Sequence, residues 1–370
     1  MIRCTNRSIN SHISDYPNFE KEYSSQFASY LFYISCKNRG DDYYLNCLYC
    51  KIFKSSCRYN SPGMETHTYG KRCYILGSCS GLLLLYIGGL FVANPLTKRF
   101  RLLDHSGSKL LPEIVDSPIV RTERAMCVGF AVNRTTKRFK IVCIFEMQTV
   151  YGFEISDGDS WRLSETTITR RTSSKCDLTM GMKPVYLDDN LHWLRNDGTI
   201  IAFNPETEQA RFIPSIFHRE PKLKLLFTSD DKINRLTLIS GTKEEISVYT
   251  LLGNLNWGLA RRIKNVPMEE STLEFWHIVA YNGERLVVRE KRMEIDRLQG
   301  VVHVYHMGAN SWTVLGSTNH FVETDIYFYK FTPSLFFIEE DEKKKVIVAP
   351  NDKNISYLTK IMSLIHNCED

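Results

Sequence analysis

Short apolar runs alternate with polar turns along most of this chain. Typical runs are "GTIIAFNP" from residue 198, "EISVYTLL" from residue 245 and "GVVHVYHM" from residue 300. Valine, isoleucine and aromatic residues dominate the runs, and glycine, asparagine and aspartate separate them. Branched and aromatic side chains suit a pleated sheet, so this composition is typical of strands. The pattern predicts an all-β chain.

Helical spacing of apolar residues is convincing only near the two ends of the sequence. Residues 17–32 place Phe19, Tyr23 and Phe27 on one face of a helix, and residues 355–367 show a similar pattern. We therefore expect one helix near each end.

The most apolar stretch, "ILGSCSGLLLLYIGGLFVANP", begins at Ile75. A membrane-spanning helix needs about 20 apolar residues, but this run is shorter and is interrupted by Gly88 and Gly89. A Gly-Gly pair tolerates the positive φ angles of a tight hairpin turn. The stretch therefore predicts two strands, "LLLLYI" and "LFVA", and because both are apolar throughout we expect cover on both faces.

The segment "GSCSG" around Cys79 resembles a nucleophile turn in spacing. Such a turn must be followed by a helix that supports the oxyanion, whereas the residues after Gly81 read as a strand. We therefore favour a small-residue turn at the start of a buried strand and expect no catalytic residue.

One local shape recurs through the chain: turn residues, a charged pair, an aromatic residue and then alternating apolar positions. "NPLTKRFRLL" from Asn94 and "NPETEQARFIP" from Asn204 are the most similar copies. Intervals of about 20 to 55 residues are typical of propeller blades, in which each sheet buries its faces only by stacking on its neighbours. We expect each copy to lead into an outer strand whose aromatic residue packs between sheets. The number of blades stays open, because the second and third of the aligned positions lie close enough to share one blade. These positions are Phe100, Phe139, Trp161, Ala210, Trp257 and Trp312.

Charge and cysteine content exclude some classes of protein. The 370 residues carry a net charge of only +5, which does not favour nucleic-acid binding. The N-terminus has no apolar leader, so the 11 cysteines do not indicate a secreted disulfide framework. We expect a cytoplasmic or nuclear protein without a membrane segment.

A zinc site is the alternative role for one group of cysteines. Cys47 and Cys50 have the C-x-x-C spacing of zinc ligands, but no second pair of matching spacing follows. Alternation along a strand fits the same residues, so we expect free thiols and neither a metal nor another cofactor. The candidate ligands near that pair are Cys36, Cys57, His67 and Cys73.

His192 and Trp193 in "NLHWL" are the candidate partner-contact residues. A strand would place the two side chains on opposite faces. Trp193 then suits the core between blades, and this structural role is the favoured interpretation. The alternative is an exposed contact at the mouth of the propeller.

Several ordered segments resemble the plant F-box-associated domain. "YILGSCSGLLLLYIGGLFVANPLTKRFRLL", "CVGFAVNRTTKRFKIV", "YGFEISDGDSWRL" and "PVYLDDNLHWLRNDGTIIAFNPETEQARFIP" match successive motifs of that family, and the match spans residues 70–320. The resemblance implies a β-propeller-like, kelch-like domain, which we assign to residues 31–350, with a helix or tail over residues 351–370.

The first 30 residues resemble the last part of an F-box, the helical element that binds a Skp-type adaptor of a cullin-RING ubiquitin ligase. The resemblance implies adaptor contacts through Ile2, Cys4, Ile9 and Ile13. Because the earlier part of the motif is not in this sequence, we expect weak or no adaptor binding, since interfaces below about 1,000 Å² are rarely stable.

The family implies a substrate-recognition subunit of an SCF-type complex that binds a target protein and is not an enzyme. The alternative is a carbohydrate-binding or carbohydrate-acting propeller without a ligase role. That alternative requires polar ligands clustered at the central channel, a pattern that the sequence does not show.

Overall fold

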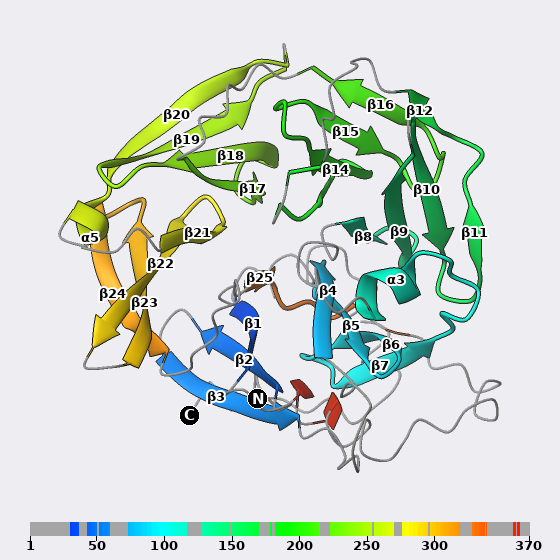
Figure 1. The fold of residues 1–370 in the computed structure, drawn as a ribbon, viewed down its shortest axis with the longest axis horizontal. Helices are drawn as coiled ribbons and strands as arrows, with labels where there is room; N and C mark the ends of the chain where they lie inside the picture. The colour runs from blue at the N-terminus through cyan, green and yellow to red at the C-terminus, as the bar shows by residue number, and fades with distance from the viewer. Residues whose placement is uncertain are drawn as a thin grey trace.

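The apolar runs form strands that pair antiparallel with their neighbours in sequence. In the computed structural model these strands make six sheets arranged around a central axis (Figure 1). The structure describes residues 30–36, 43–49, 52–59, 73–116, 127–147, 150–169, 178–179, 182–214, 223–253, 255–269, 276–294, 297–318, 328–336, 338, 358–359 and 361–362. The predicted all-β propeller is confirmed.

Three of the sheets are each formed by strands that are consecutive along the chain. The first is β4 (Cys73–Cys79), β5 (Leu82–Ile87), β6 (Leu90–Asn94) and β7 (Arg99–Leu103). The second is β8 (Val128–Asn133), β9 (Arg138–Glu146), β10 (Val150–Ser156) and β11 (Trp161–Leu163), with β12 (Ile168–Thr169) also paired to β10. The third is β13 (Val185–Leu187), β14 (Asn190–Leu194), β15 (Ile200–Phe203) and β16 (Ala210–Ile213).

Two further sheets complete this series, and the last one closes the ring. The fourth is β17 (Lys224–Asp230), β18 (Arg235–Gly241), β19 (Glu245–Leu251) and β20 (Trp257–Lys264). The fifth is β21 (Trp276–Tyr281), β22 (Arg285–Glu294), β23 (Arg297–His306) and β24 (Ser311–Thr318). In the closing sheet, β25 (Phe328–Phe331) pairs with β1 (Tyr30–Cys36), which continues to β2 (Tyr43–Tyr49) and β3 (Ile52–Tyr59). The two ends of the propeller are thus joined in one sheet.

The hydrophobic cores lie between neighbouring blades, as stacked sheets require. One core joins β4–β7 to β8–β11, and another places Phe153 against Phe203, whose rings stack at 4.1 Å. Every residue of β6 is buried, and β5 is buried except at Tyr86. The predicted hairpin between β5 and β6 is confirmed, and Gly88 adopts the positive φ of 60° expected at its turn.

The aligned repeat positions mark the outer edges of blades, with one exception. Trp161 and Trp312 donate from Nε1 to the carbonyls of Asp104 and Lys264, at the end of the preceding blade's outer strand. Trp257, Ala210 and Phe100 also lie on outer strands. The outer-strand prediction was wrong for Phe139, which lies on β9, because a similar turn also joins the first two strands of a blade. The idea that Phe139 and Trp161 share one blade is confirmed.

The helical elements differ in part from expectation. The helix expected over residues 17–32 was wrong at its end, because Tyr30, Leu31 and Phe32 belong to β1, where branched and aromatic residues pair on both sides. Residues 1–29 lie outside the described part of the chain. Two short helices were not anticipated, α3 (Leu111–Asp116) and α5 (Val266–Glu269).

Near the C-terminus, the predicted helical pattern agrees with the described residues. Residues 358–359 and 361–362 are helical, and Leu358, Ile361 and Met362 are buried. Their spacing of three and four positions is that of one helix face.

Candidate functional site

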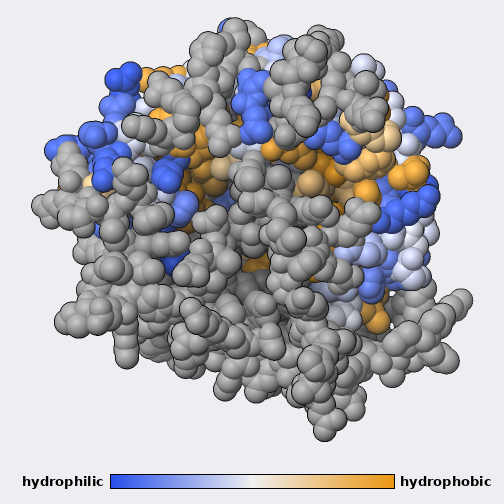
Figure 2. All heavy atoms as spheres, in the orientation of Figure 1, coloured by the Kyte–Doolittle hydropathy of each residue, from blue (hydrophilic) through white to orange (hydrophobic). Residues whose placement is uncertain are grey.

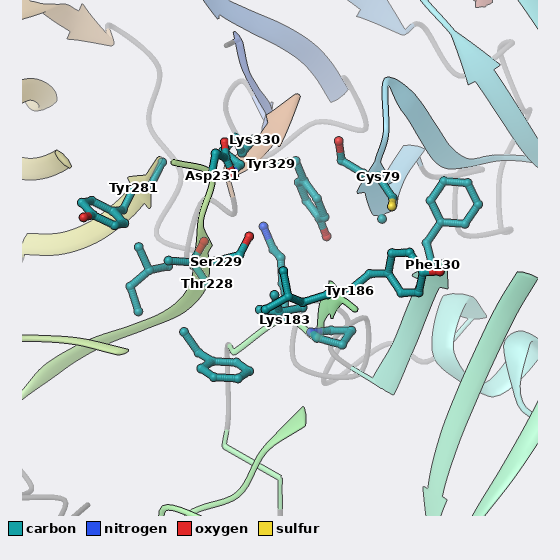
Figure 3. A pocket seen from close by; sticks show the side chains of 18 of the residues that line it. Cys79, Phe130, Lys183, Tyr186, Thr228, Ser229, Asp231, Tyr281, Tyr329 and Lys330 are labelled. Atoms are coloured by element: carbon teal, nitrogen blue, oxygen red, sulfur yellow. The ribbon is translucent and has the colours of Figure 1, made fainter. Parts of the chain in front are cut away.

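A cavity of 1060 Å³ runs along the axis of the propeller. It is lined by β4, β8, β13, β17, β21 and β25, the innermost strand of each blade, and Figure 3 shows some of its side chains. Its volume is slightly above the range of about 300 to 1,000 Å³ typical of pockets for small ligands. The propeller therefore offers an internal binding space as well as outer surfaces.

The turns that follow the inner strands meet at one mouth of this cavity and bond across blades. Arg134 donates from Nε to Ser80 Oγ at 3.1 Å, and Asn234 donates to Asp188 at 2.8 Å. Lys330 pairs with Asp231 at 2.6 Å. These contacts fix the mouth and show that the inner strands run in the same direction.

Two tyrosines serve as donors at the same mouth. Tyr281 donates its hydroxyl to Asp230 at 2.9 Å, and Tyr186 donates to Asp189 at 3.1 Å. Burial and then the neighbouring aspartate raise the pKa of each phenol. Both hydroxyls therefore stay protonated over the whole physiological range.

Lys183 lies at the other end of the cavity, two residues before β13. Its Nζ sits 3.2 Å from the centre of the Tyr329 ring, and Figure 3 shows the side chain extending toward that ring. Burial lowers the pKa of Lys183 well below its usual value, because the charged form loses hydration. The sequence analysis missed both residues, since 146 positions separate them and only the closed ring brings them together.

Cys79 does not have the features of a nucleophile. Burial raises the pKa of its thiol, whereas a reactive cysteine needs a lowered one. Ser80 and Gly81 have φ angles of 48° and 79° and turn the chain directly into β5. The predicted turn is confirmed, and the helix that a nucleophile turn requires is replaced by a strand.

Both candidate partner-contact residues are buried. Trp193 is 1% exposed and packs between two blades near Phe153. His192 is 5% exposed on the opposite face of β14, and its Nδ1 donates to the Val185 carbonyl at 3.2 Å. The placement agrees with the favoured structural role, and contact of either residue with a partner stays a prediction.

Burial lowers the pKa of His192 to about 4. The unfolded chain takes up the proton near pH 6.5, so the stability due to neutral His192 is complete above that pH and is lost as pH falls toward 4. We expect His192→Asn, which keeps a donor near Val185, to reduce the loss of unfolding free energy between pH 6.5 and pH 5 by about 1.5 kcal/mol. Urea unfolding at both pH values measures this difference. An unchanged pH dependence would contradict it, and His306→Gln on β23 serves as the control.

No group of metal ligands stands out among the described residues. They contain no cluster of three or more His, Cys, Asp or Glu side chains that could hold a metal. Cys36, Cys47, Cys57 and Cys73 lie on strands, but the geometry of their side chains is outside the description, as are Cys50 and His67 entirely. The free-thiol prediction for this group therefore stays a prediction.

The candidate adaptor residues Ile2, Cys4, Ile9 and Ile13 also lie outside the described residues.

Within the described part of the chain, no helix is long and apolar enough to cross a membrane. In the upper part of the face in Figure 2, hydrophilic side chains gather toward the outer edge and most hydrophobic ones lie further in.

Known proteins resemble this chain over most of its length. A family model described as "F-box associated beta propeller domain" matches residues 53–254. A protein of Arabidopsis thaliana named as an F-box/kelch-repeat protein is 61% identical over 382 residues, covering 99% of this chain and 90% of that protein. A second Arabidopsis thaliana protein, named as an F-box protein, is 64% identical over 277 residues, covering 74% of this chain and 88% of its own.

Likeness to solved structures is much weaker. A protein of unknown function from Bacteroides thetaiotaomicron aligns with 83% of this chain and 68% of its own at 10% identity, with a TM-score of 0.42, too low to support an inference. The family match and the two relatives agree with the motifs, the six sheets and the closed ring. The chain therefore belongs to the plant F-box proteins that carry an F-box-associated β-propeller domain.

Proposed function

We propose that this protein is a substrate-recognition subunit of an SCF-type ubiquitin ligase. The observation that carries the proposal is the match to an F-box/kelch-repeat protein, which is 61% identical and covers 99% of this chain. This match includes the N-terminal segment as well as the propeller. In this role the propeller binds a target protein and the N-terminal segment binds a Skp-type adaptor.

The propeller contributes binding rather than chemistry to this role. Its central cavity has one mouth formed by turns that hydrogen bonds hold across blades, which suits recognition by a preformed surface. The cavity thiol, Cys79, is kept protonated by burial. We therefore infer a receptor that acts on its target through the ligase it recruits, and we expect it in the cytoplasm or nucleus.

Ring closure gives the N-terminal segment a fixed point of attachment. β1 begins at Tyr30 and is held between β25 and β2. A Skp-type adaptor bound through Ile9 or Ile13 would thus be linked to the propeller through its closing blade. This connection would hold a target at a limited distance from the ligase.

Adaptor binding by the purified full chain tests the proposal. The partial F-box motif alone predicts weak adaptor binding, but the match to an F-box/kelch-repeat protein extends over 99% of this chain. Under the proposed role we therefore expect a Skp-type plant adaptor to bind with a Kd of about 1 μM or below, equivalent to about 8 kcal/mol. Ile9→Arg should abolish this binding, because an apolar helical contact cannot accept a buried unpaired charge. Ser11→Arg adds the same charge at a polar position and should retain it. Failure to bind while a full F-box relative binds would refute the ligase role.

A further inference from the structure

Exposed apolar side chains are concentrated on one blade at the end of the propeller that holds the cavity mouth. In the blades whose strands are consecutive along the chain, the first and last turns lie at this end, because neighbouring strands are antiparallel. Among the described residues of these turns, the exposed large apolar side chains are Ile233, Leu252 and Leu255, at 51%, 39% and 42% exposure. All three belong to the blade of β17–β20.

The two turns that carry these side chains are neighbours. β18 and β19 are paired, so the turn before β18, with Ile233, lies beside the turn after β19, with Leu252 and Leu255. Leu252 also lies over Gly258, where an added Cβ would come within 2.9 Å of its Cδ1. We call Ile233, Leu252 and Leu255 the apolar patch. A grouping of exposed apolar side chains is a common feature of protein-binding surfaces.

Leu255 has a backbone conformation that leucine rarely adopts. Its φ is 63°, in the left-handed region where a Cβ is strained. Glycine or asparagine would form this turn at a lower cost. An exposed leucine at a strained position is a poor choice for stability, and contact with a partner accounts for both features.

Two carboxylates of the preceding blade border the apolar patch. Asp188 and Asp189 form the two-residue turn between β13 and β14. Asn234, the residue after Ile233, donates from Nδ2 to Asp188 at 2.8 Å and joins the two blades. Tyr186 donates to Asp189 at 3.1 Å. Both donors are neutral, and neither aspartate forms an ion pair with a described residue, so both negative charges remain available to a partner.

The cations near the apolar patch do not neutralise this pair of aspartates. Lys232 pairs with Glu284 of the following blade at 3.2 Å. Arg235 is opposite Asp230 in the β17–β18 pairing, and Asp230 accepts from Tyr281 of the following blade. Arg235 therefore lies on the face of its sheet that is turned away from β13 and β14. The side of the apolar patch toward the preceding blade is acidic.

From this arrangement we propose that the apolar patch and the Asp188–Asp189 turn bind a segment of the target protein in which lysine or arginine stands beside large apolar side chains. The apolar side chains of the segment pack on Ile233, Leu252 and Leu255, and its cation pairs with the two carboxylates. Hydrogen bonds already hold the turns, so little ordering is needed on binding. The proposal rests on the recognition role of the propeller and names the chemistry of the target.

Selection of random dodecapeptides, displayed on phage, against the purified full chain tests the proposal. We expect enriched peptides to combine Lys or Arg with Leu, Ile or Phe. Calorimetric titration then measures the affinity of the most enriched peptide. Asp188→Asn with Asp189→Asn should weaken it about tenfold or more, because the paired charge is lost while both acceptors and the turn are kept. Glu244→Gln with Glu245→Gln removes two charges at the opposite end of the β17–β20 blade and should leave it unchanged.

Leu255→Asn tests the apolar part of the surface. It should weaken the same peptide about tenfold or more without lowering the midpoint of thermal unfolding, because asparagine adopts a positive φ more readily than leucine. Met147→Asn is the matched control. Met147 is 43% exposed on the turn between β9 and β10, at the other end of the propeller, and its replacement should not change the affinity.

Several results would overturn the proposal: no enriched peptide, enrichment of acidic or uncharged peptides, or an affinity that either the aspartate variant or Leu255→Asn leaves unchanged. A dimer of the full chain that Leu255→Asn dissociates would also overturn it, because a second copy would then occupy the apolar patch. These measurements use the chain without an adaptor. Their failure is therefore distinct from a failure of adaptor binding.

Discussion

Replacing Gly81 by alanine is expected to lower the free energy of unfolding by about 4 kcal/mol, from overpacking together with a left-handed backbone. Gly81 has a φ of 79°, which alanine adopts only at a cost. Its added Cβ would also lie against Ser334 Oγ and 2.6 Å from the Ser334 backbone nitrogen. Because Ser334 follows β25, the substitution displaces the segment that closes the ring.

Urea unfolding followed by circular dichroism measures this loss, and Gly308→Ala is the matched control. Gly308 lies between β23 and β24, and a Cβ there would meet no atom within 4 Å. Adding Ser334→Gly to Gly81→Ala should recover part of the lost stability, because it removes the clash with Ser334 Oγ. The recovery should be incomplete, because the close contact with the Ser334 backbone nitrogen and the positive φ of residue 81 remain. Equal stability of Gly81→Ala and Gly308→Ala would contradict the close packing at this turn.

Asn94→Ala is expected to destabilise the protein by about 4 kcal/mol, because it leaves two buried carbonyls without their donor and weakens a turn. Asn94 is fully buried and donates from Nδ2 to the carbonyls of Ser334 and Phe336, at 3.0 and 2.8 Å. Its Oδ1 accepts from the backbone of Leu96 and Thr97. One side chain thus forms the β6–β7 turn and also holds the segment after β25.

Asn204→Ala separates these two contributions. Asn204 accepts from the backbone of Glu206 and Thr207 in the same kind of turn, at 2.9 Å each. Loss of these two turn hydrogen bonds should cost about 2 kcal/mol, at about 1 kcal/mol for each net hydrogen bond. Thermal unfolding of the two variants side by side measures the difference. Equal losses would show that the contacts of Asn94 with the closing segment contribute nothing.

The blade architecture could be predicted from the sequence because its signals are local. A similar five-residue turn recurs, with Asn or Asp first, bonding the backbone two and three residues on, and a positive φ at the fifth position. Asparagine and aspartate suit such turns by bonding their own backbone. These turns begin at Asn94, Asn133, Asn204 and Asp230.

What the sequence could not predict depends on ring closure or on contacts between distant residues. The strand from Tyr30 was included in a helix because its partner β25 begins 298 residues later, at Phe328. Helix α3 follows Ser108, whose Oγ bonds the buried Glu154 on β10 at 2.7 Å. Lys183 and Tyr329 likewise meet only when the blades are stacked. None of these contacts leaves a local pattern.

Recovery of the cullin with this protein from plant cells tests the central claim most directly. We predict that the tagged full chain co-precipitates a Skp-type adaptor together with its cullin, and that Ile9→Arg with Ile13→Arg removes both without changing the amount of folded protein. The control variant Ser11→Arg should still co-precipitate both the adaptor and the cullin. Absence of adaptor and cullin from the wild-type precipitate, while a full F-box relative recovers them in parallel, would contradict the account of this protein as a ligase subunit.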